Sequence, residues 1–89
     1  MQTELIHVGF DNHIALNRVI AIASPGSAPV KRMVQRGKEE QRALDLTSGR
    51  RTKAVVTLDN DWVALIAITP ETFASRVASM RPGASAHTA

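Results

Sequence analysis

The 89-residue sequence contains no cysteine, no tyrosine, one tryptophan and two phenylalanines. Without cysteine, neither a disulfide framework nor a cysteine-based zinc site can stabilise the fold, and this absence fits a cytosolic protein. A base-stacking platform needs several aromatic side chains. The small number here does not favour binding of single-stranded nucleic acid by stacking. The core is therefore expected to consist of Val, Ile, Leu, Ala and Met.

Long hydrophobic runs are also missing. No apolar run approaches the roughly 20 residues that span a membrane, and the first stretch, MQTELIHVGF, lacks the basic start and apolar core of a secretory signal. We expect a cytoplasmic protein with one domain, residues 1–81, followed by a disordered tail, residues 82–89. A domain of this size buries only roughly 60 to 65% of its unfolded surface, so self-association is a plausible source of further burial.

Patterns typical of catalysis or metal binding do not occur. The histidines His7, His13 and His87 have no metal-ligand spacing, and a structural or solvated role is expected for each. Asp59 and Asp61 flank a predicted hairpin tip that faces water, whereas paired catalytic carboxylates need a cleft. No GxxxxGK(S/T) phosphate loop is present. The sequence therefore predicts a protein that is not an enzyme and has no cofactor, no metal and no small-molecule substrate.

The positive charge is concentrated in one part of the chain. The net charge is +3, but residues 18–53 alone hold nine cationic and three anionic side chains. A basic segment beside an acidic remainder favours a polyanionic partner on one side of the molecule. Arginine outnumbers lysine eight to three, and its planar, forked guanidinium suits phosphate oxygens and guanine edges. This pattern indicates nucleic acid.

The densest basic stretch is SGRRTK, residues 48–53. Ser48-Gly49 predicts a turn, and Arg50, Arg51 and Lys53 follow it directly. Backbone N–H groups at such a turn can also face a phosphate, so we predict anion binding here in preference to a purely solvated turn.

Two further sets of cations are less decisive. Arg18 lies among apolar residues, where a charge needs a partner or an exposed edge, and three cations of the first predicted helix fit either a solvated face or a supporting basic surface: Lys31, Arg32 and Arg36.

Hydrophobic periodicity predicts a small α+β domain with a mostly antiparallel sheet and two short helices packed on one face. The predicted order is β-β-α-β-β-α, with one additional short edge strand in residues 43–47. Strands are expected within residues 5–10, 14–24, 54–58 and 62–68, and helices after Ser27 and from Pro70. Ser27 is the predicted N-cap of the first helix. Gly37 within this helix either shortens it or allows a close contact.

Several motifs together resemble one known family. They are VGFDNHI followed by RVIAI, then SPGSAPVKR, SGRRTKAV and PET. Over residues 4–78 the sequence is similar to the RemA family of small bacterial extracellular-matrix regulatory proteins. The resemblance implies DNA-binding transcriptional regulators that activate biofilm-matrix operons, assemble as closed homo-oligomeric rings and have a LytTR-like fold. It also implies DNA contact by an arginine near the second strand and by a pair after the glycine turn, which match Arg18, Arg50 and Arg51 here.

The leading hypothesis is a cytoplasmic, nucleoid-associated activator that binds double-stranded DNA as a ring and bends or wraps it. Self-association would use apolar residues near Ile14, Leu16 or Trp62. Two alternatives stay open: an RNA-binding or ribosome-associated protein, and a basic protein-interaction module. The predicted DNA-binding residues are Arg18, Arg50, Arg51, Lys53, Lys31, Arg32 and Arg36.

Overall fold

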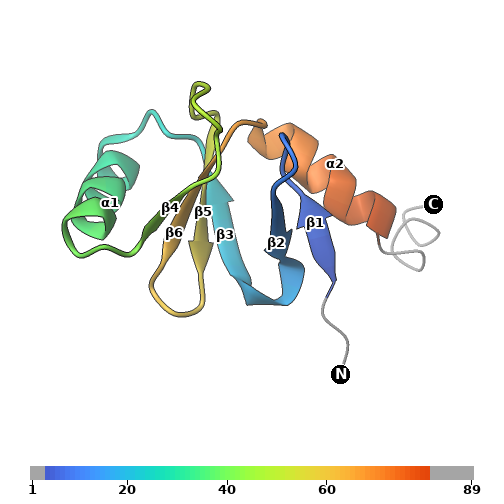
Figure 1. Ribbon diagram of the computed structural model, residues 1–89, viewed down its shortest axis with the longest axis horizontal. Coiled ribbons are helices and arrows are strands. Elements are labelled where there is room, and N and C mark those ends of the chain that lie inside the picture. The colour runs from blue at the N-terminus through green and yellow to red at the C-terminus, as the bar shows by residue number, and fades with distance from the viewer. Residues whose placement is uncertain (1–3, 81–89) are drawn as a thin grey trace.

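The computed structural model describes residues 4–80, so the predicted tail, residues 82–89, lies outside the described residues. Figure 1 shows the arrangement of the elements. In chain order they are β1 (Leu5–His7), β2 (His13–Ala15), the 3-10 helix η1 (Leu16–Arg18), β3 (Val19–Ala23), α1 (Ala28–Glu39), β4 (Ala43–Asp45), β5 (Ala54–Leu58), β6 (Val63–Ile66) and α2 (Pro70–Met80).

The predicted α+β class is confirmed. Four strands form the main sheet in the order β3-β5-β6-β4, and β1 and β2 form a separate antiparallel hairpin. Within the main sheet β3–β5 and β5–β6 are antiparallel, while β4 runs parallel to β6. The short strand predicted within residues 43–47 is therefore present, at an edge of the sheet. β5 and β6 form the centre, as expected for the two most apolar stretches.

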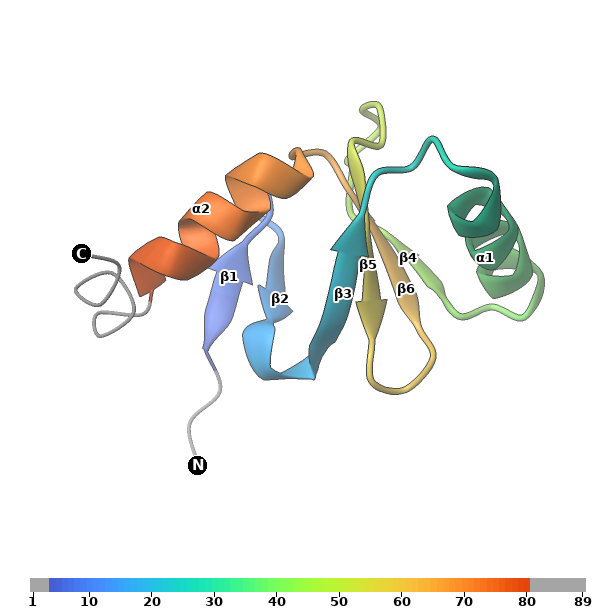
Figure 2. The same ribbon diagram turned by 180° about the vertical axis from the view of Figure 1, so that it is seen from behind.

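The prediction that both helices pack on one face is wrong. Val30, Met33 and Val34 of α1 pack against Val55, Val63 and Leu65 on one face of the sheet. Phe73 and Val77 of α2 belong to a second cluster on the opposite face, together with the β1–β2 hairpin. Figures 1 and 2 show α1 and α2 on opposite sides of the sheet. The reason lies in β6, where all four residues are buried, because a strand that is apolar on both faces needs cover on both.

The strand predicted within residues 14–24 is divided in two. Ile14 in β2 pairs with Ile6 in β1 and both are buried, whereas Val19–Ala23 joins the main sheet as β3. Between them, η1 redirects the chain from the hairpin into the sheet. The first strand also ends earlier than predicted, at His7. Ile14 is consequently a core residue, which excludes it from the surfaces available for self-association.

The first helix begins as predicted. The Ser27 hydroxyl accepts a hydrogen bond from the Val30 N–H at 3.4 Å, and a proline occupies the first turn. Gly37 is buried, and a Cβ atom added there would lie 2.9 Å from Val63 Cγ2. Of the two alternatives for Gly37, the close contact is correct, since the helix continues to Glu39. Within residues 4–80, no helix is both long and apolar enough to cross a membrane.

Candidate nucleic-acid interface

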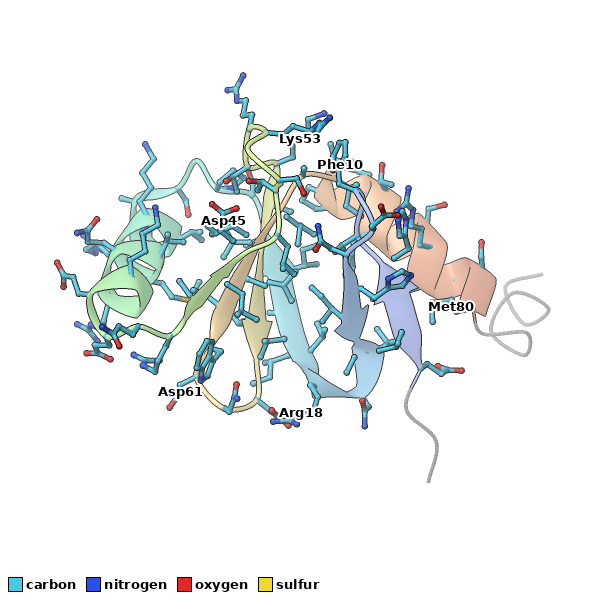
Figure 3. All side chains as sticks on the ribbon, viewed as in Figure 1. Phe10, Arg18, Asp45, Lys53, Asp61 and Met80 are labelled. Carbon is cyan, nitrogen blue, oxygen red and sulfur yellow. The ribbon has the colours of Figure 1, made fainter. Side chains whose placement is uncertain are left out.

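Two segments that are far apart in the sequence meet at one end of the sheet. The first is the segment between β4 and β5, residues 46–53, here called the basic loop. The second is the turn between β1 and β2, residues 9–12, here called the hairpin turn. Figure 3 shows Phe10 of the hairpin turn and Lys53 of the basic loop at the same end of the molecule. Contacts between these segments determine the shape of the basic loop.

The start of the basic loop is fixed by Asp45 and Thr47. One Asp45 carboxylate oxygen accepts hydrogen bonds from the Thr47 hydroxyl at 2.6 Å and from the Thr47 N–H at 3.0 Å. The side-chain hydrogen bond from Thr47, followed by the backbone one, lowers the pKa of Asp45 below its ordinary value. Thr47 itself is only 2% exposed. The loop therefore leaves β4 in a defined direction.

Asn12 connects the hairpin turn to the basic loop. Its side-chain amide donates to the Leu46 carbonyl oxygen at 3.0 Å. The same nitrogen lies within hydrogen-bonding distance of the Gly9 and Phe10 carbonyl oxygens, at 3.3 and 3.2 Å. Since one amide group bonds to both segments, the loop and the turn are held as a unit.

Arg50 is held by Phe10. The Arg50 guanidinium carbon lies 3.7 Å from the centre of the Phe10 ring, a cation–π contact. The Arg50 backbone N–H donates to the Thr47 carbonyl oxygen at 3.0 Å. This hydrogen bond closes the predicted turn at Ser48-Gly49, where both residues have positive φ. The Arg50 N–H group is therefore bonded within the protein and is not available to a phosphate.

Arg51 and Lys53 are the unpaired cations of the loop. Both are exposed, and within residues 4–80 neither side chain forms a hydrogen bond or an ion pair. The Lys53 backbone N–H donates to the Ile66 carbonyl oxygen at 2.9 Å, which anchors the end of the loop to the sheet. A fixed backbone with free cationic side chains is an arrangement that can bind a polyanion.

Arg18 lies at the opposite end of the sheet from the basic loop, near the β5–β6 hairpin (Figure 3). Its Nε atom is 2.7 Å from Asp59 Oδ1, and its backbone carbonyl accepts from the Asp59 N–H. From Lys53 to Asp59 along β5 is about 20 Å, at about 3.3 Å per residue. The structure therefore does not bring Arg18 together with Arg50 and Arg51 within one subunit.

The cations of α1 border a separate groove. Arg32 and Arg36 line a depression of about 570 Å³ between α1, β3 and the β5–β6 hairpin. Its apolar lining includes Ile20, Met33 and Trp62. Ile20 is 66% exposed on the outer strand β3. Lys31 is exposed on the same helix and does not line the groove. The predicted site residues are thus distributed over three surfaces.

The histidines of the hairpin form a different cluster. His7 and His13 are cross-strand partners, with ring centroids 5.0 Å apart. Arg76 Nη1 on α2 donates to the His7 carbonyl oxygen at 2.8 Å and lies 3.1 Å from His7 Nδ1. Within the described residues, no group of three His, Cys, Asp or Glu side chains could hold a metal ion. The cluster joins α2 to β1.

The comparisons with known proteins define first a class and then a family. A protein of Synechococcus sp. is 48% identical over 88 residues and is matched over 99% of both chains. A protein of Dehalococcoides mccartyi is 46% identical over 84 residues, 94% of this chain and 88% of its own, and one of Moorella thermoacetica is 45% identical over 86 residues, 97% of this chain and 94% of its own. Each is named "Putative regulatory protein", so the class is that of small bacterial regulators.

The family is shown by a family model that matches nearly all of the described residues. Residues 5–77 match the model of the RemA-like family, described as extracellular matrix regulatory protein A-like. The chain belongs to this family, which confirms the resemblance inferred from the motifs. The names of the family and its relatives indicate a regulatory protein and not an enzyme.

Two residues of the interface were not identified from the sequence. Phe10 and Asn12 both lie in the motif VGFDNHI, and Phe10 was placed at the end of a predicted strand. Neither was given a role, yet both contact the basic loop. Asn12 bonds to Leu46, 34 positions away in the chain, a distance at which local patterns carry no information. The signal in the sequence that could have found both residues is the motif VGFDNHI, which contains them.

Proposed function

We propose that this protein is a transcriptional regulator that binds double-stranded DNA through the basic loop. The observation that carries the proposal is the loop itself: Arg50, Arg51 and Lys53 extend from a backbone fixed by Asn12, Thr47 and the central strand β6. Because the backbone is already ordered, little further conformational entropy is lost when phosphates bind. In accordance with the family description, the proposed targets are extracellular-matrix genes. A protein that binds DNA in this way would be located at the nucleoid.

One subunit supplies only a few phosphate contacts, which bind DNA weakly at physiological salt. We therefore include in the proposal that several copies assemble as a ring and present repeated basic loops to one duplex. A duplex that follows a curved array of such loops is bent, so flexible base steps are favoured. Arg18 and the α1 cations Lys31, Arg32 and Arg36 would then be secondary contacts, reached by DNA that passes beyond the basic loop.

The ring requires two different surfaces on each subunit, because a head-to-tail contact is heterologous. The two outer strands of the main sheet supply them. Ile20 on β3 is 66% exposed and Leu44 on β4 is 40% exposed. Ile20 also borders the groove that contains Trp62. In the proposed assembly, the β4 edge of one copy packs against the β3 edge and groove of the next.

A mixing experiment tests this assembly. Ile20→Asp and Leu44→Asp each remove one of the two surfaces, so each variant alone should be monomeric by light scattering coupled to size exclusion. An equimolar mixture retains one intact contact between the two variants, so it should give a dimer and nothing larger. A ring that persists in either variant, or a mixture that stays monomeric, would show that these strands do not form the interface.

DNA binding is tested by fluorescence anisotropy of a labelled duplex across a salt series. Arg51→Ala should weaken binding and flatten the log–log slope by about 0.9 for each contacting subunit. Arg76→Gln is the charge control, because it removes one positive charge from α2, where Arg76 contacts His7. An equal loss in both variants would mean that net charge, and not the loop, drives binding.

Competition separates DNA from the RNA alternative. Unlabelled duplex DNA and unlabelled structured RNA are added at equal phosphate concentration to the labelled complex. Stronger displacement by the DNA supports the proposal, since A-form RNA presents its phosphates with a different groove geometry. Stronger displacement by RNA would favour an RNA-binding protein instead.

A further inference from the structure

Phe10 occupies a backbone conformation that suits other residues better. It is the first central residue of the hairpin turn, which is closed by a hydrogen bond from the Asn12 N–H to the Gly9 carbonyl oxygen at 3.0 Å. Its φ is +56° and that of Asp11 is +67°. Two-residue hairpin turns with positive φ favour Asn, Asp or Gly, because a bulky side chain is crowded in the left-handed region. The backbone therefore gives no reason for a phenylalanine.

Core packing gives no reason either. Phe10 is 43% exposed, and it belongs to neither of the two hydrophobic clusters of the described residues. Its ring lies instead against the Arg50 guanidinium, at 3.7 Å, at the end of the sheet that carries Lys53 (Figure 3). An exposed aromatic ring thus lies against one cation of the basic loop, in a backbone conformation that is unfavourable for phenylalanine. Unfavourable backbone geometry at an exposed position is typical of functional residues.

We propose that Phe10 inserts between bases of the bound duplex. The ring would enter the minor groove and wedge into a partly unstacked base step, while Arg50 leaves the face of the ring and joins Arg51 and Lys53 on the flanking phosphates. Apolar side chains flanked by arginine or lysine kink DNA in this way, most readily at flexible pyrimidine–purine steps. This inference rests on the proposed function, because it concerns how the same loop treats its DNA.

The test uses 2-aminopurine, whose fluorescence rises when it unstacks, placed at TA steps of a duplex of about 30 base pairs. Wild type should increase this fluorescence. Phe10→Asn should abolish the increase and weaken binding roughly tenfold, the loss of one base–aromatic stack. Its salt slope should stay unchanged, since no cation is removed. Phe10→Leu should retain part of the signal, because leucine can also act as a wedge.

Thermal unfolding distinguishes a binding role from a structural one. Because Asn fits the turn, the unfolding midpoint of Phe10→Asn should equal or exceed that of wild type, even though DNA binding is impaired. Leu5→Asn is the matched control: Leu5 lies on the same hairpin away from the turn and is 59% exposed. Leu5→Asn should leave the fluorescence increase intact.

The possible failures separate this inference from the proposed function. If wild type binds the duplex with a normal salt dependence but gives no 2-aminopurine signal, the insertion of Phe10 is refuted and DNA binding stands. The same holds if Phe10→Asn gives the wild-type signal, or if its only effect is a lower unfolding midpoint. If wild type shows no salt-dependent binding, both proposals fail together.

Discussion

Replacing Asn12 by alanine tests the connection between the hairpin turn and the basic loop most directly. The variant removes a half-buried amide that donates to Leu46 at 3.0 Å and lies within 3.3 Å of two further carbonyl oxygens. An amide group has two N–H donors, so at most two good hydrogen bonds are lost. At about 1 kcal/mol net for each, the expected loss of stability is about 1–2 kcal/mol.

Two assays measure this effect. Urea unfolding at one fixed protein concentration gives the stability, and a loss of this size should lower the thermal midpoint by roughly 5–15 °C. DNA anisotropy gives the second readout. All cations are retained in Asn12→Ala, so the salt slope should stay the same, while affinity falls by roughly threefold to tenfold because a looser loop must be ordered on binding.

Gln35→Ala is the matched control for Asn12→Ala. Gln35 is also an amide with one hydrogen bond, to Glu39 at 3.1 Å, but it is exposed on α1. Its loss should change stability by less than about 0.5 kcal/mol and leave DNA binding unchanged. If Asn12→Ala behaves like Gln35→Ala in both assays, the basic loop does not depend on the hairpin turn and our account of its rigidity is incorrect.

Three further predictions concern the fold around the site. Gly37→Ala should destabilise the protein by about 1–2 kcal/mol in urea unfolding, because the added Cβ meets Val63 at 2.9 Å and this overpacking outweighs the gain in helix propensity; a more stable variant would show that α1 can shift. The lowered pKa of Asp45 contributes stability that is present above the ordinary pKa of 3.8 and is lost as the pH falls through the lower folded value. Asp45→Asn should remove this part of the pH dependence, and identical acid-unfolding curves for the two proteins would contradict it. Ser27→Ala should lower stability by about 1 kcal/mol through loss of the N-cap, measured in the same urea assay.

The sequence was sufficient where local chemistry determines structure. Three predicted features depend only on residues that are close together in the sequence, and all three are present: the Ser27 cap, the hairpin between β5 and β6, and the start of α2 at Pro70. The side of the sheet on which each helix packs was predicted wrongly, because both helices were expected on one face and they lie on opposite faces. A continuous apolar run such as Val63–Ile66 shows that both faces are covered, but it does not say by which element.

In the candidate site too, features that depend on neighbouring residues were predicted, and features that depend on distant residues were not. Arg50, Arg51 and Lys53 stand out in the sequence because they are adjacent, and the turn predicted before them is present. The residues that hold them are not adjacent: Phe10 and Asn12 come from the β1–β2 hairpin near the start of the sequence, and Asn12 is 34 positions from Leu46. Arg18 was grouped with the arginine pair by resemblance alone. The chain path places it beside Asp59, at the other end of the sheet, and its contact with DNA stays a prediction. Long-range contacts of this kind are determined by topology, which one sequence does not reveal.

The contact between Asn12 and Leu46 has a consequence for chimaeras built between relatives. An exchange of residues 46–53 alone would transplant the cations but leave a foreign hairpin turn beneath them. The donor loop would then lack its own partners for the Leu46 carbonyl and the Arg50 guanidinium. The smallest transferable module is therefore discontinuous and comprises residues 9–12 together with 46–53.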